Sequence, residues 1–347
     1  MRVLTVVGAR PQFVKAAPVS HALKKAGIDE VLVHTGQHFD VAMSQVFFDE
    51  LNIPAPQHNL EIHGGGHGEM TGRMLLALEP VVLNERPAAV IVYGDTNSTL
   101  AGALVASKLH IPVVHIEAGL RSFNRRMPEE VNRVLTDHVS ELLLCPTPAA
   151  VRHLAQEGIT QGVHHVGDVM YDATLLAREI ADKHSSVLDD LRVRDGRYAL
   201  ATVHRAENTD DPVRLAEILR WLQARAAEHP IVFPVHPRTA ARVRELGLDF
   251  GSLTVCDPLG YLDMTRLLAG AVAVYTDSGG VQKEAYFHRK PCVTLRDETE
   301  WTETIECGWN RLWQGPDYTT RREIKDYGEG HAADIVARCL LDLPSMR

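Results

Sequence analysis

The sequence predicts an α/β fold with two parallel sheets, and two observations lead to this prediction. Short runs rich in Val, Ile and Leu recur along the 347-residue chain, and the segments between them are long enough for a helix. At about 150 residues per domain, the length also fits two domains. We therefore expect two Rossmann-like domains facing each other, with a ligand in the cleft at the carboxyl ends of the strands.

The individual elements follow from these patterns. Strands are expected at 2–7, 31–34, 89–93, 112–116 and 141–145 in the first half, and at 197–203, 231–235, 253–256, 271–276 and 291–295 in the second. Amphipathic stretches predict helices at 14–26, 69–85, 97–109, 212–228 and 279–288. The first run of strands ends near 166–172, which predicts domains of residues 1–168 and 169–328.

Composition excludes several partners. The formal net charge is −9, whereas a nucleic acid or an anionic membrane surface is bound by concentrated Lys and Arg. The first apolar run ends at Gly8, too soon for a membrane span. Five scattered Cys without a Cys-x-x-Cys pair argue against a disulfide framework or zinc ribbon and favour a reducing cytoplasm. A small anionic ligand is still compatible with this composition.

The first expected strand ends in GARPQFVK (8–15). Gly8 permits a tight turn and Pro11 suits the first helical position, so Arg10 is expected at a helix N-terminus with Lys15 one turn onward. Backbone amides and two cations at such a turn can hold a phosphate. The segment is neither a Gly-x-Gly-x-x-Gly nor a Walker loop, and a plain turn with a surface Arg fits it equally well.

Carboxylates gather after the next strands of the first half. Asp95 follows one expected strand and Glu117 the next, and Glu129 and Glu130 come shortly after, with Arg133 on the helix face of Glu129. Each has a plainer explanation: Asp95 as a helix cap, the two glutamates as solvated first-turn residues. Their convergence on one sheet edge predicts an acid/base cluster.

In the second half, two strands are followed by His and then Arg. His204 precedes Arg205, and His236 is followed two residues later by Arg238. One such His is more often a hydrogen-bonded loop residue. Two at equivalent strand ends favour an anion site.

A glycine pair marks the strongest ligand signal of the second half. The strand 271–276 is followed by Ser278, a good helix N-cap, and then by Gly279 and Gly280. Glycines at this place let backbone amides approach a diphosphate at the positive end of a helix dipole. Glu284, near one turn further on, is expected to accept hydrogen bonds from ribose hydroxyls.

No metal site is predicted. His63 and His67 flank three glycines, which are poor helix formers. His115-x-Glu117 lacks the Pro-Cys-x-x-Cys that accompanies it in zinc deaminases.

Taken together, these segments resemble the non-hydrolysing UDP-N-acetylglucosamine 2-epimerases over essentially the whole chain. The resemblance is carried by GARPQFVKAAPV (8–19), GDTNSTLAG (94–102), HIEAGLRS (115–122), MPEEVNRVLTDH (127–138), TVHRAEN (202–208), PVHPR (234–238), TDSGGVQKEA (276–285) and LRDETEW (295–301). It implies a GT-B glycosyltransferase-like fold, a C-terminal helix within about 329–347 that returns to the first domain, a homodimer, a UDP-sugar substrate and no cofactor.

The resemblance also implies a role for each candidate residue. UDP would be bound by Arg10, His204, Ser278, Gly279, Gly280 and Glu284, and the sugar site would be lined by Lys15, Asp95, Glu117, Glu129, Arg133 and His236. Inversion at carbon 2 removes a proton that no adjacent carbonyl acidifies, so the anomeric C–O bond would break first. UDP then leaves, a 2-acetamidoglucal forms, and UDP adds back. Asp95, Glu117 and Glu129 are the candidate acids and bases, and His204 the candidate that stabilises the departing diphosphate.

Two departures from the family pattern bear on specificity. The usual Arg-Asp-x-Thr-Glu-Arg-Pro appears as RDETEWT (296–302), and Trp301 in place of Arg resembles relatives acting on UDP-2,3-diacetamido-2,3-dideoxyglucuronic acid. Phe39 stands where allosterically regulated bacterial members typically carry Arg. Three other functions stay open: a hydrolysing 2-epimerase, a GT-B glycosyltransferase, and a silent nucleotide-sugar binding protein.

Overall fold

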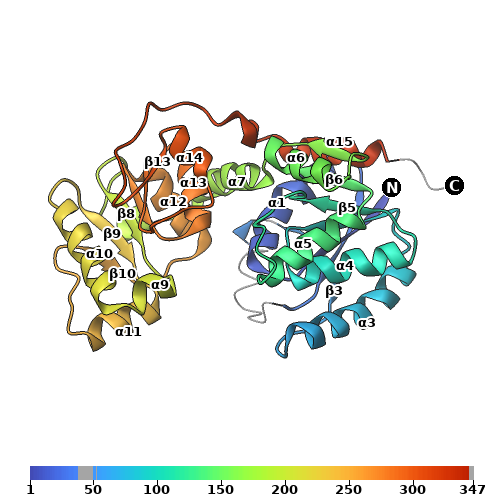
Figure 1. Cartoon of the computed structure of the whole chain (residues 1–347), viewed down its shortest axis with the longest axis horizontal. Helices are drawn as coiled ribbons and strands as arrows, with labels where there is room; N and C mark the ends of the chain where they lie inside the picture. Colours follow the sequence, from blue (N-terminus) through green and yellow to red (C-terminus); the bar gives the residue numbers. More distant parts are fainter. Residues whose placement is uncertain (38–49, 52, 344–347) are drawn as a thin grey trace. The chain divides into compact units, whose positions relative to one another are not determined.

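A computed structural model describes residues 1–37, 50–51 and 53–343 of the chain (Figure 1). Its internal contacts divide it into two units, Met1–Leu176 with Lys325–Arg347, and Ala177–Ile324. No helix in these described ranges is both long and apolar enough to span a bilayer. Phe39 lies outside the described residues.

The first unit is built on a seven-stranded parallel sheet in the order β3-β2-β1-β4-β5-β6-β7. Its strands are β1 (Arg2–Val7), β2 (Asp29–His34), β3 (His58–Asn59), β4 (Ala89–Tyr93), β5 (Val113–Ile116), β6 (Leu142–Cys145) and β7 (Val163–His165). Its helices are α1 (Arg10–Lys25), α3 (His67–Glu85), α4 (Asn97–Lys108), α5 (Pro128–His138), α6 (Pro148–Gln156), the 3-10 helix η1 (Lys325–Tyr327) and α15 (Ala332–Leu341).

The second unit repeats this plan with a six-stranded parallel sheet in the order β10-β9-β8-β11-β12-β13. Its strands are β8 (Ala199–Thr202), β9 (Ile231–Pro234), β10 (Thr254–Cys256), β11 (Val274–Thr276), β12 (Cys292–Thr294) and β13 (Asn310–Leu312). Its helices are α8 (Val187–Asp190), α9 (Ala206–Thr209), α10 (Pro212–Arg225), α11 (Pro237–Glu245), α12 (Tyr261–Gly270), α13 (Gly279–Phe287) and α14 (Thr302–Glu306), while α7 (Val169–His184) crosses the boundary between the units.

The central strands of both sheets are buried, which explains their largely apolar sequences. β4 is buried at each of its five positions, as expected for a central parallel strand. Helix α4 packs closely on this part of the sheet: a Cβ added at Gly102 would lie 3.1 Å from the side chains of Val6 and Val92. This close packing fixes the start of α4 against the ends of β1 and β4. The predicted α/β fold class with two Rossmann-like sheets is confirmed.

The C-terminal helix α15 belongs to the first unit, where it packs against α1 (Figure 1). Lys25 pairs with Asp334 across this contact at 3.3 Å. The carboxylate of Asp172 accepts the backbone N–H groups of Ala332 and Ala333 at 3.2 and 2.9 Å. It thereby satisfies donors that the first turn of a helix leaves without intrahelical partners.

Each sheet reverses its strand order once, between β1 and β4 in the first unit and between β8 and β11 in the second. Ligands of open α/β sheets bind beyond the carboxyl ends of the strands at such a reversal. The candidate residues are therefore expected at two places, which we call the first and second edges: the carboxyl ends of the strands around β1 and β4, and those around β8 and β11.

Candidate active site

The first edge brings charged side chains together after β4 and β5. Tyr93 is paired with Ile116 in the sheet, so Asp95 and Glu117 follow neighbouring strands at one edge. Glu117 forms an ion pair with Lys15 of α1, and both side chains are only 13% exposed. Glu117 also has a φ of +72°, a left-handed conformation that a non-glycine residue keeps only where its surroundings hold it.

Arg133 of α5 joins two carboxylates at the same edge. Its guanidinium pairs with Asp95 and, at 2.9 Å, with Glu130. Glu129, expected on the same helix face as Arg133, is instead exposed, and Glu130 is the residue that binds Arg133. The alternative interpretation of Asp95 as a helix cap is wrong, because Thr96 is the N-cap of α4.

Glu130 and Glu129 differ sharply in their surroundings. Glu130 is buried and accepts the backbone N–H groups of Ser122 and Phe123 at 2.8 and 2.9 Å. Burial raises the pKa of Glu130, but these hydrogen bonds and the charge of Arg133 outweigh it and hold the pKa below its usual value. Glu130 is thus a structural carboxylate and not a solvated one. Glu129 makes no hydrogen bond or ion pair within the described part of the chain, so a ligand can reach it.

The turn after β1 is organised differently from the expected phosphate loop. Arg10 begins α1 as predicted and is exposed. The amides of Gly8 and Ala9, however, both donate to the side-chain oxygen of Gln12, at 2.8 and 3.0 Å. These two amides are therefore engaged within the turn and lend no support to the expected phosphate site. Lys15, bound to Glu117, points to the carboxylate cluster.

At the second edge, His204 lies beside a buried carboxylate. Thr202 is paired with Thr276, so the segments after β8 and β11 start side by side. Asp277 is fully buried and accepts the backbone N–H groups of His204 and Arg205 at 3.0 and 2.9 Å and the amide of Asn208 at 3.0 Å. The Nδ1 of His204 lies 3.2 Å from Asp277 Oδ1, and the His204 side chain is 47% exposed.

Asp277 is the origin of this orientation. Burial raises its pKa, but the hydrogen bond and charge of His204, the Arg205 amide and Asn208 outweigh it and hold the pKa below its usual value. An ionised Asp277 fixes the imidazole of His204 through Nδ1 and leaves Nε2 on the exposed side, without a partner in the residues that the structure describes. This arrangement suits a group that meets a ligand.

The glycine segment begins α13 as predicted. Ser278 is the N-cap, and its hydroxyl accepts the N–H of Val281 at 3.5 Å. Gly279 is buried and Gly280 exposed, so the positive end of the helix dipole opens at Gly280. Glu284 is half-buried further along α13.

His236 is placed at the end of the neighbouring strand β9, but it has a local partner. Its Nδ1 accepts the backbone N–H of Arg238 at 3.2 Å and caps α11. Arg238 in turn binds Asp210 at 2.7 and 2.9 Å. Its charge is therefore engaged on the surface, and this His-Arg pair lends less support to an anion site than the sequence suggested. His236 itself is exposed.

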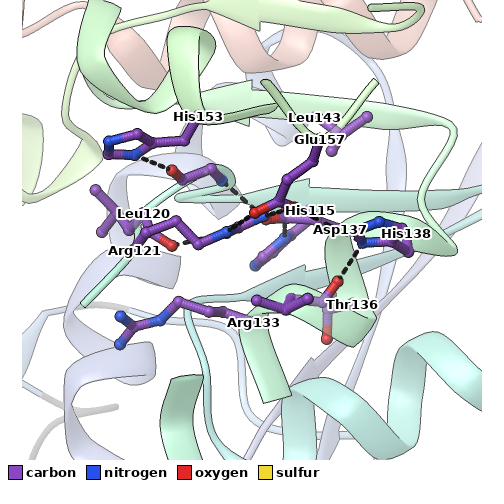
Figure 2. A network of polar contacts seen from close by, with 12 residues as sticks. His115, Leu120, Arg121, Arg133, Thr136, Asp137, His138, Leu143, His153 and Glu157 are labelled. Atoms are coloured by element: carbon purple, nitrogen blue, oxygen red, sulfur yellow. Dashed lines mark hydrogen bonds and ion pairs between the residues drawn. The ribbon is translucent and has the colours of Figure 1, made fainter. Parts of the chain in front are cut away.

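Sequence reasoning missed a set of buried partners behind both edges. Asp277, within the same motif as Ser278, was not singled out. His115, Arg121 and Asp137 form a polar network behind the first edge (Figure 2). Two features of the sequence could have indicated this network. His115 is a polar residue within an otherwise apolar strand, and Asp137 lies on the inner face of a helix, and a buried polar group at either place needs a partner.

Comparisons with known proteins agree on one family. The family model described as UDP-N-acetylglucosamine 2-epimerase matches residues 21–340. The chain is 55% identical over 360 residues to UDP-2,3-diacetamido-2,3-dideoxy-D-glucuronate 2-epimerase of Pseudomonas aeruginosa, covering 99% of this chain and 100% of the relative. It is 46% identical over 322 residues to UDP-N-acetylglucosamine 2-epimerase of Methanocaldococcus jannaschii, covering 90% and 88%.

Two solved structures are similar over nearly the whole chain. One is the M. jannaschii UDP-GlcNAc 2-epimerase in complex with UDP-GlcNAc and UDP, with a TM-score of 0.82, 42% identity and coverage of 98% and 99%. The other is the Neisseria meningitidis enzyme bound to UDP-GlcNAc, with a TM-score of 0.84, 29% identity and coverage of 98% and 100%. The chain therefore belongs to the UDP-N-acetylglucosamine 2-epimerase family.

Proposed function

We propose that this chain is a non-hydrolysing 2-epimerase of UDP-2-acetamido sugars that eliminates UDP and adds it back through a 2-acetamidoglucal. The observation that carries the proposal is the contrast between the two sheet edges. One edge gathers carboxylates suited to proton transfer, and the other presents an oriented His and a helix N-terminus suited to a diphosphate. A glycosyltransferase has little need of the carboxylate cluster at the first edge.

The second unit, predicted as residues 169–328, is proposed to hold UDP. The amides at Gly279 and Gly280 and the Ser278 cap would receive the diphosphate, and Glu284 the ribose. His204, oriented by Asp277, would stabilise the negative charge that develops as the anomeric C–O bond breaks. Arg10 is also proposed to bind UDP, as the family resemblance implies.

The first unit, predicted as residues 1–168 with the C-terminal helix, is proposed to carry the proton transfers. Once the C–O bond is breaking, the cationic centre at carbon 1 acidifies the proton on carbon 2, and a carboxylate removes it. A second carboxyl group, in its protonated form, delivers a proton to the opposite face when UDP adds back. Asp95, Glu117 and Glu129 are the proposed groups. Arg133 would hold Asp95 in place, and Lys15 would hold Glu117. His236 is proposed to line the sugar site.

Trp301 supports a uronic acid as the preferred substrate. Its indole Nε1 is buried without a hydrogen-bond partner among the described residues. A Cβ added at Gly279 would lie 3.5 Å from that nitrogen, so the indole stands beside the start of α13. Lys283 Nζ lies 4.3 Å from the Trp301 ring centroid. The relative named as a 2-epimerase of UDP-2,3-diacetamido-2,3-dideoxy-D-glucuronate is 55% identical, and we propose this sugar first and UDP-N-acetylglucosamine second.

Proton NMR in heavy water tests the proposal. The purified chain is incubated with each UDP-sugar in turn, and we expect a gluco/manno pair with deuterium at carbon 2 of both epimers. Turnover without deuterium would overturn the elimination mechanism. Stoichiometric release of free UDP would indicate a hydrolysing 2-epimerase, and turnover only with a sugar acceptor would indicate a glycosyltransferase.

The assembly and location are also proposals. We propose a homodimer, as the family resemblance implies, and a reducing cytoplasm, which fits five cysteines that are all free thiols in the structure. Light scattering of the purified chain tests the first, and a thiol titration of protein taken directly from cells tests the second.

A further inference from the structure

A buried charge network lies behind the first edge and takes no part in the proposed chemistry. It consists of His115 on β5, Arg121 after β5, Asp137 on α5 and Glu157 after α6, and we call it the Asp137 network (Figure 2). Arg121 donates to Asp137 through Nη1 at 2.7 Å. It also donates to the two carboxylate oxygens of Glu157 through Nε and Nη2, each at 2.7 Å. The side chains of His115 and Asp137 are completely buried.

Asp137 holds the chain on both sides of Glu117. One carboxylate oxygen lies 2.7 Å from Nδ1 of His115, two residues before Glu117. The other accepts the backbone N–H of Gly119, two residues after Glu117, at 3.1 Å. The turn between these two anchors is the one in which Glu117 has a φ of +72°. A single carboxylate thus holds the strained turn at both ends.

His115 extends this hold to the turn before Asp95. Its Nε2 donates to the carbonyl oxygen of Gly94 at 2.8 Å, while the N–H of Gly94 donates to Ile116 at 3.0 Å. Gly94 has a φ of +61°, and a Cβ there would lie 3.1 Å from the carboxylate of Glu117. The Gly94 turn and the Glu117 side chain are therefore in close contact, and His115 ties one to the other.

Both ring nitrogens of His115 face oxygens that accept hydrogen bonds. A carbonyl oxygen can only accept, so Nε2 carries a proton. Burial raises the pKa of Asp137, but the charges of and hydrogen bonds from His115 and Arg121 outweigh it and hold the pKa below its usual value, so Asp137 is an acceptor too. The ring of His115 is therefore held between two acceptors, the Asp137 carboxylate and the Gly94 carbonyl.

We propose that His115 and Asp137 are positioning residues for the 2-epimerisation, which hold Glu117 and the Gly94–Asp95 turn in register with each other. The inference rests on the proposed function, because it assumes that Asp95 and Glu117 act on the sugar. It adds two completely buried residues to those proposed to act on the sugar. Displacing an acid/base group by about 1 Å can cost about 10²-fold in rate.

Two variants of His115 separate the two bonds, and both replace the imidazole by the same uncharged amide group. In His115→Gln, the amide nitrogen takes the place of Nε2 and keeps the bond to Gly94. In His115→Asn, the shorter amide takes the place of Nδ1, keeps the bond to Asp137 and loses Gly94. We expect kcat of H115N to fall by about 10²-fold and that of H115Q by about tenfold, with KM and UDP affinity within about twofold of the wild type in both.

His138→Gln is the matched control. His138 lies at the end of α5, the helix that carries Asp137, and is half exposed. Among the described residues it bonds to the Val134 carbonyl of its own helix at 2.8 Å and approaches Glu157 at 3.9 Å. We expect wild-type kcat. If H115N and H115Q had the same kcat and had lost the same amount of thermal stability, the network would have only a structural role. That result would overturn the proposal.

A measurement on the unaltered chain covers the case in which the variants do not fold. Nitrogen NMR of ¹⁵N-histidine-labelled protein should show both His115 ring nitrogens protonated, and a nitrogen without a proton would overturn the proposal. A wild-type protein that turns over no UDP-sugar, or that gives no deuterium at carbon 2, would instead overturn the proposed function.

Discussion

Each unit contains a buried aspartate beside a histidine near the carboxyl ends of its central strands, and the two histidines differ in burial and in hydrogen bonding. In the first unit, His115 lies 2.7 Å from Asp137, is completely buried and has both ring nitrogens bound. In the second unit, His204 lies 3.2 Å from Asp277 and is 47% exposed, with Nε2 on the open side.

The difference shows that a buried Asp beside a His does not by itself define a catalytic pair. The aspartate orients the ring in both units. The second nitrogen decides the role: when the fold occupies it, the histidine can only hold other residues in place, and when it is free, the histidine can act on a ligand. The comparison therefore sets the first unit, which we propose to place the carboxylates, apart from the second unit, which we propose to bind the diphosphate.

The largest effect is expected from Glu117→Gln, which removes the carboxylate that the first unit holds in place. We expect kcat to fall by about 10³-fold, the range of a lost acid/base group. UDP affinity, measured by calorimetry, should be unchanged, because Glu117 belongs to the other unit. Comparable loss of UDP affinity would contradict the division of roles.

His204→Asn tests the free nitrogen of the second unit. Its amide nitrogen can keep the contact with Asp277, but nothing replaces Nε2. We expect kcat/KM to fall by about 10²-fold, as for the loss of one donor to a developing charge, together with weaker UDP binding. If H204N lost kcat alone and kept full UDP affinity, it would behave like H115N, and the two histidines would not differ in kind.

The sequence allowed the central elements to be predicted because their signal is local. Strands such as β1 and β4 are predominantly apolar runs, and both ends of each were predicted to the residue. The strands β3, β7 and β13 have only two or three residues and are largely polar (HN, VHH and NRL), so nothing along the chain distinguishes them from a loop. They exist because a neighbouring strand offers free backbone groups, which is tertiary information.

The site was predictable to the same extent. Asp95 and Glu117 could be placed because they directly follow predictable strands. The partners could not: Arg133 binds Glu130 and not Glu129, because only Glu130 meets the Ser122 turn that folds back on α5. Choices between adjacent residues depend on the exact rotation of a helix, and a pattern along the chain does not specify it.

Asp277→Asn tests how much the buried carboxylate stabilises the second unit. At pH 7 we expect a loss of about 2 kcal/mol in the free energy of unfolding, because an amide N–H then faces backbone donors. The folded pKa of Asp277 lies below its unfolded value of about 3.9. The ionised carboxylate therefore stabilises the fold fully above the unfolded pKa, and this contribution is lost as the pH falls from the unfolded pKa through the folded one. The difference between variant and wild type in the free energy of unfolding should therefore be smaller at pH 3 than at pH 7.

Urea unfolding followed by tryptophan fluorescence measures this directly. The four tryptophans, Trp221, Trp301, Trp309 and Trp313, all lie in the second unit, so the signal reports on it alone. A gap that stays the same from pH 7 to pH 3 would contradict an ionised Asp277 and, with it, the orientation of His204.

The smallest effect, and the sharpest test of where the diphosphate binds, is expected from Gly280→Ala. A Cβ at Gly280 meets only Ser278 Oγ, at 4.0 Å, whereas a Cβ at Gly279 would lie 2.2 Å from Glu300 Oε1. Gly280→Ala therefore fits the protein without UDP and adds a favourable helical residue. If the diphosphate approaches the amides here, the methyl group should weaken UDP binding by about tenfold, which is about 1.4 kcal/mol.

Gly72→Ala in the middle of α3 provides the control, since a Cβ there has nothing within 4 Å. Both variants replace a helical glycine by alanine where space is open, so both should leave thermal stability equal or slightly raised. Only G280A should change UDP affinity measured by calorimetry. If both kept wild-type affinity, the diphosphate would not approach the start of α13 closely, and the free nitrogen of His204 would have to meet the ligand elsewhere along the edge.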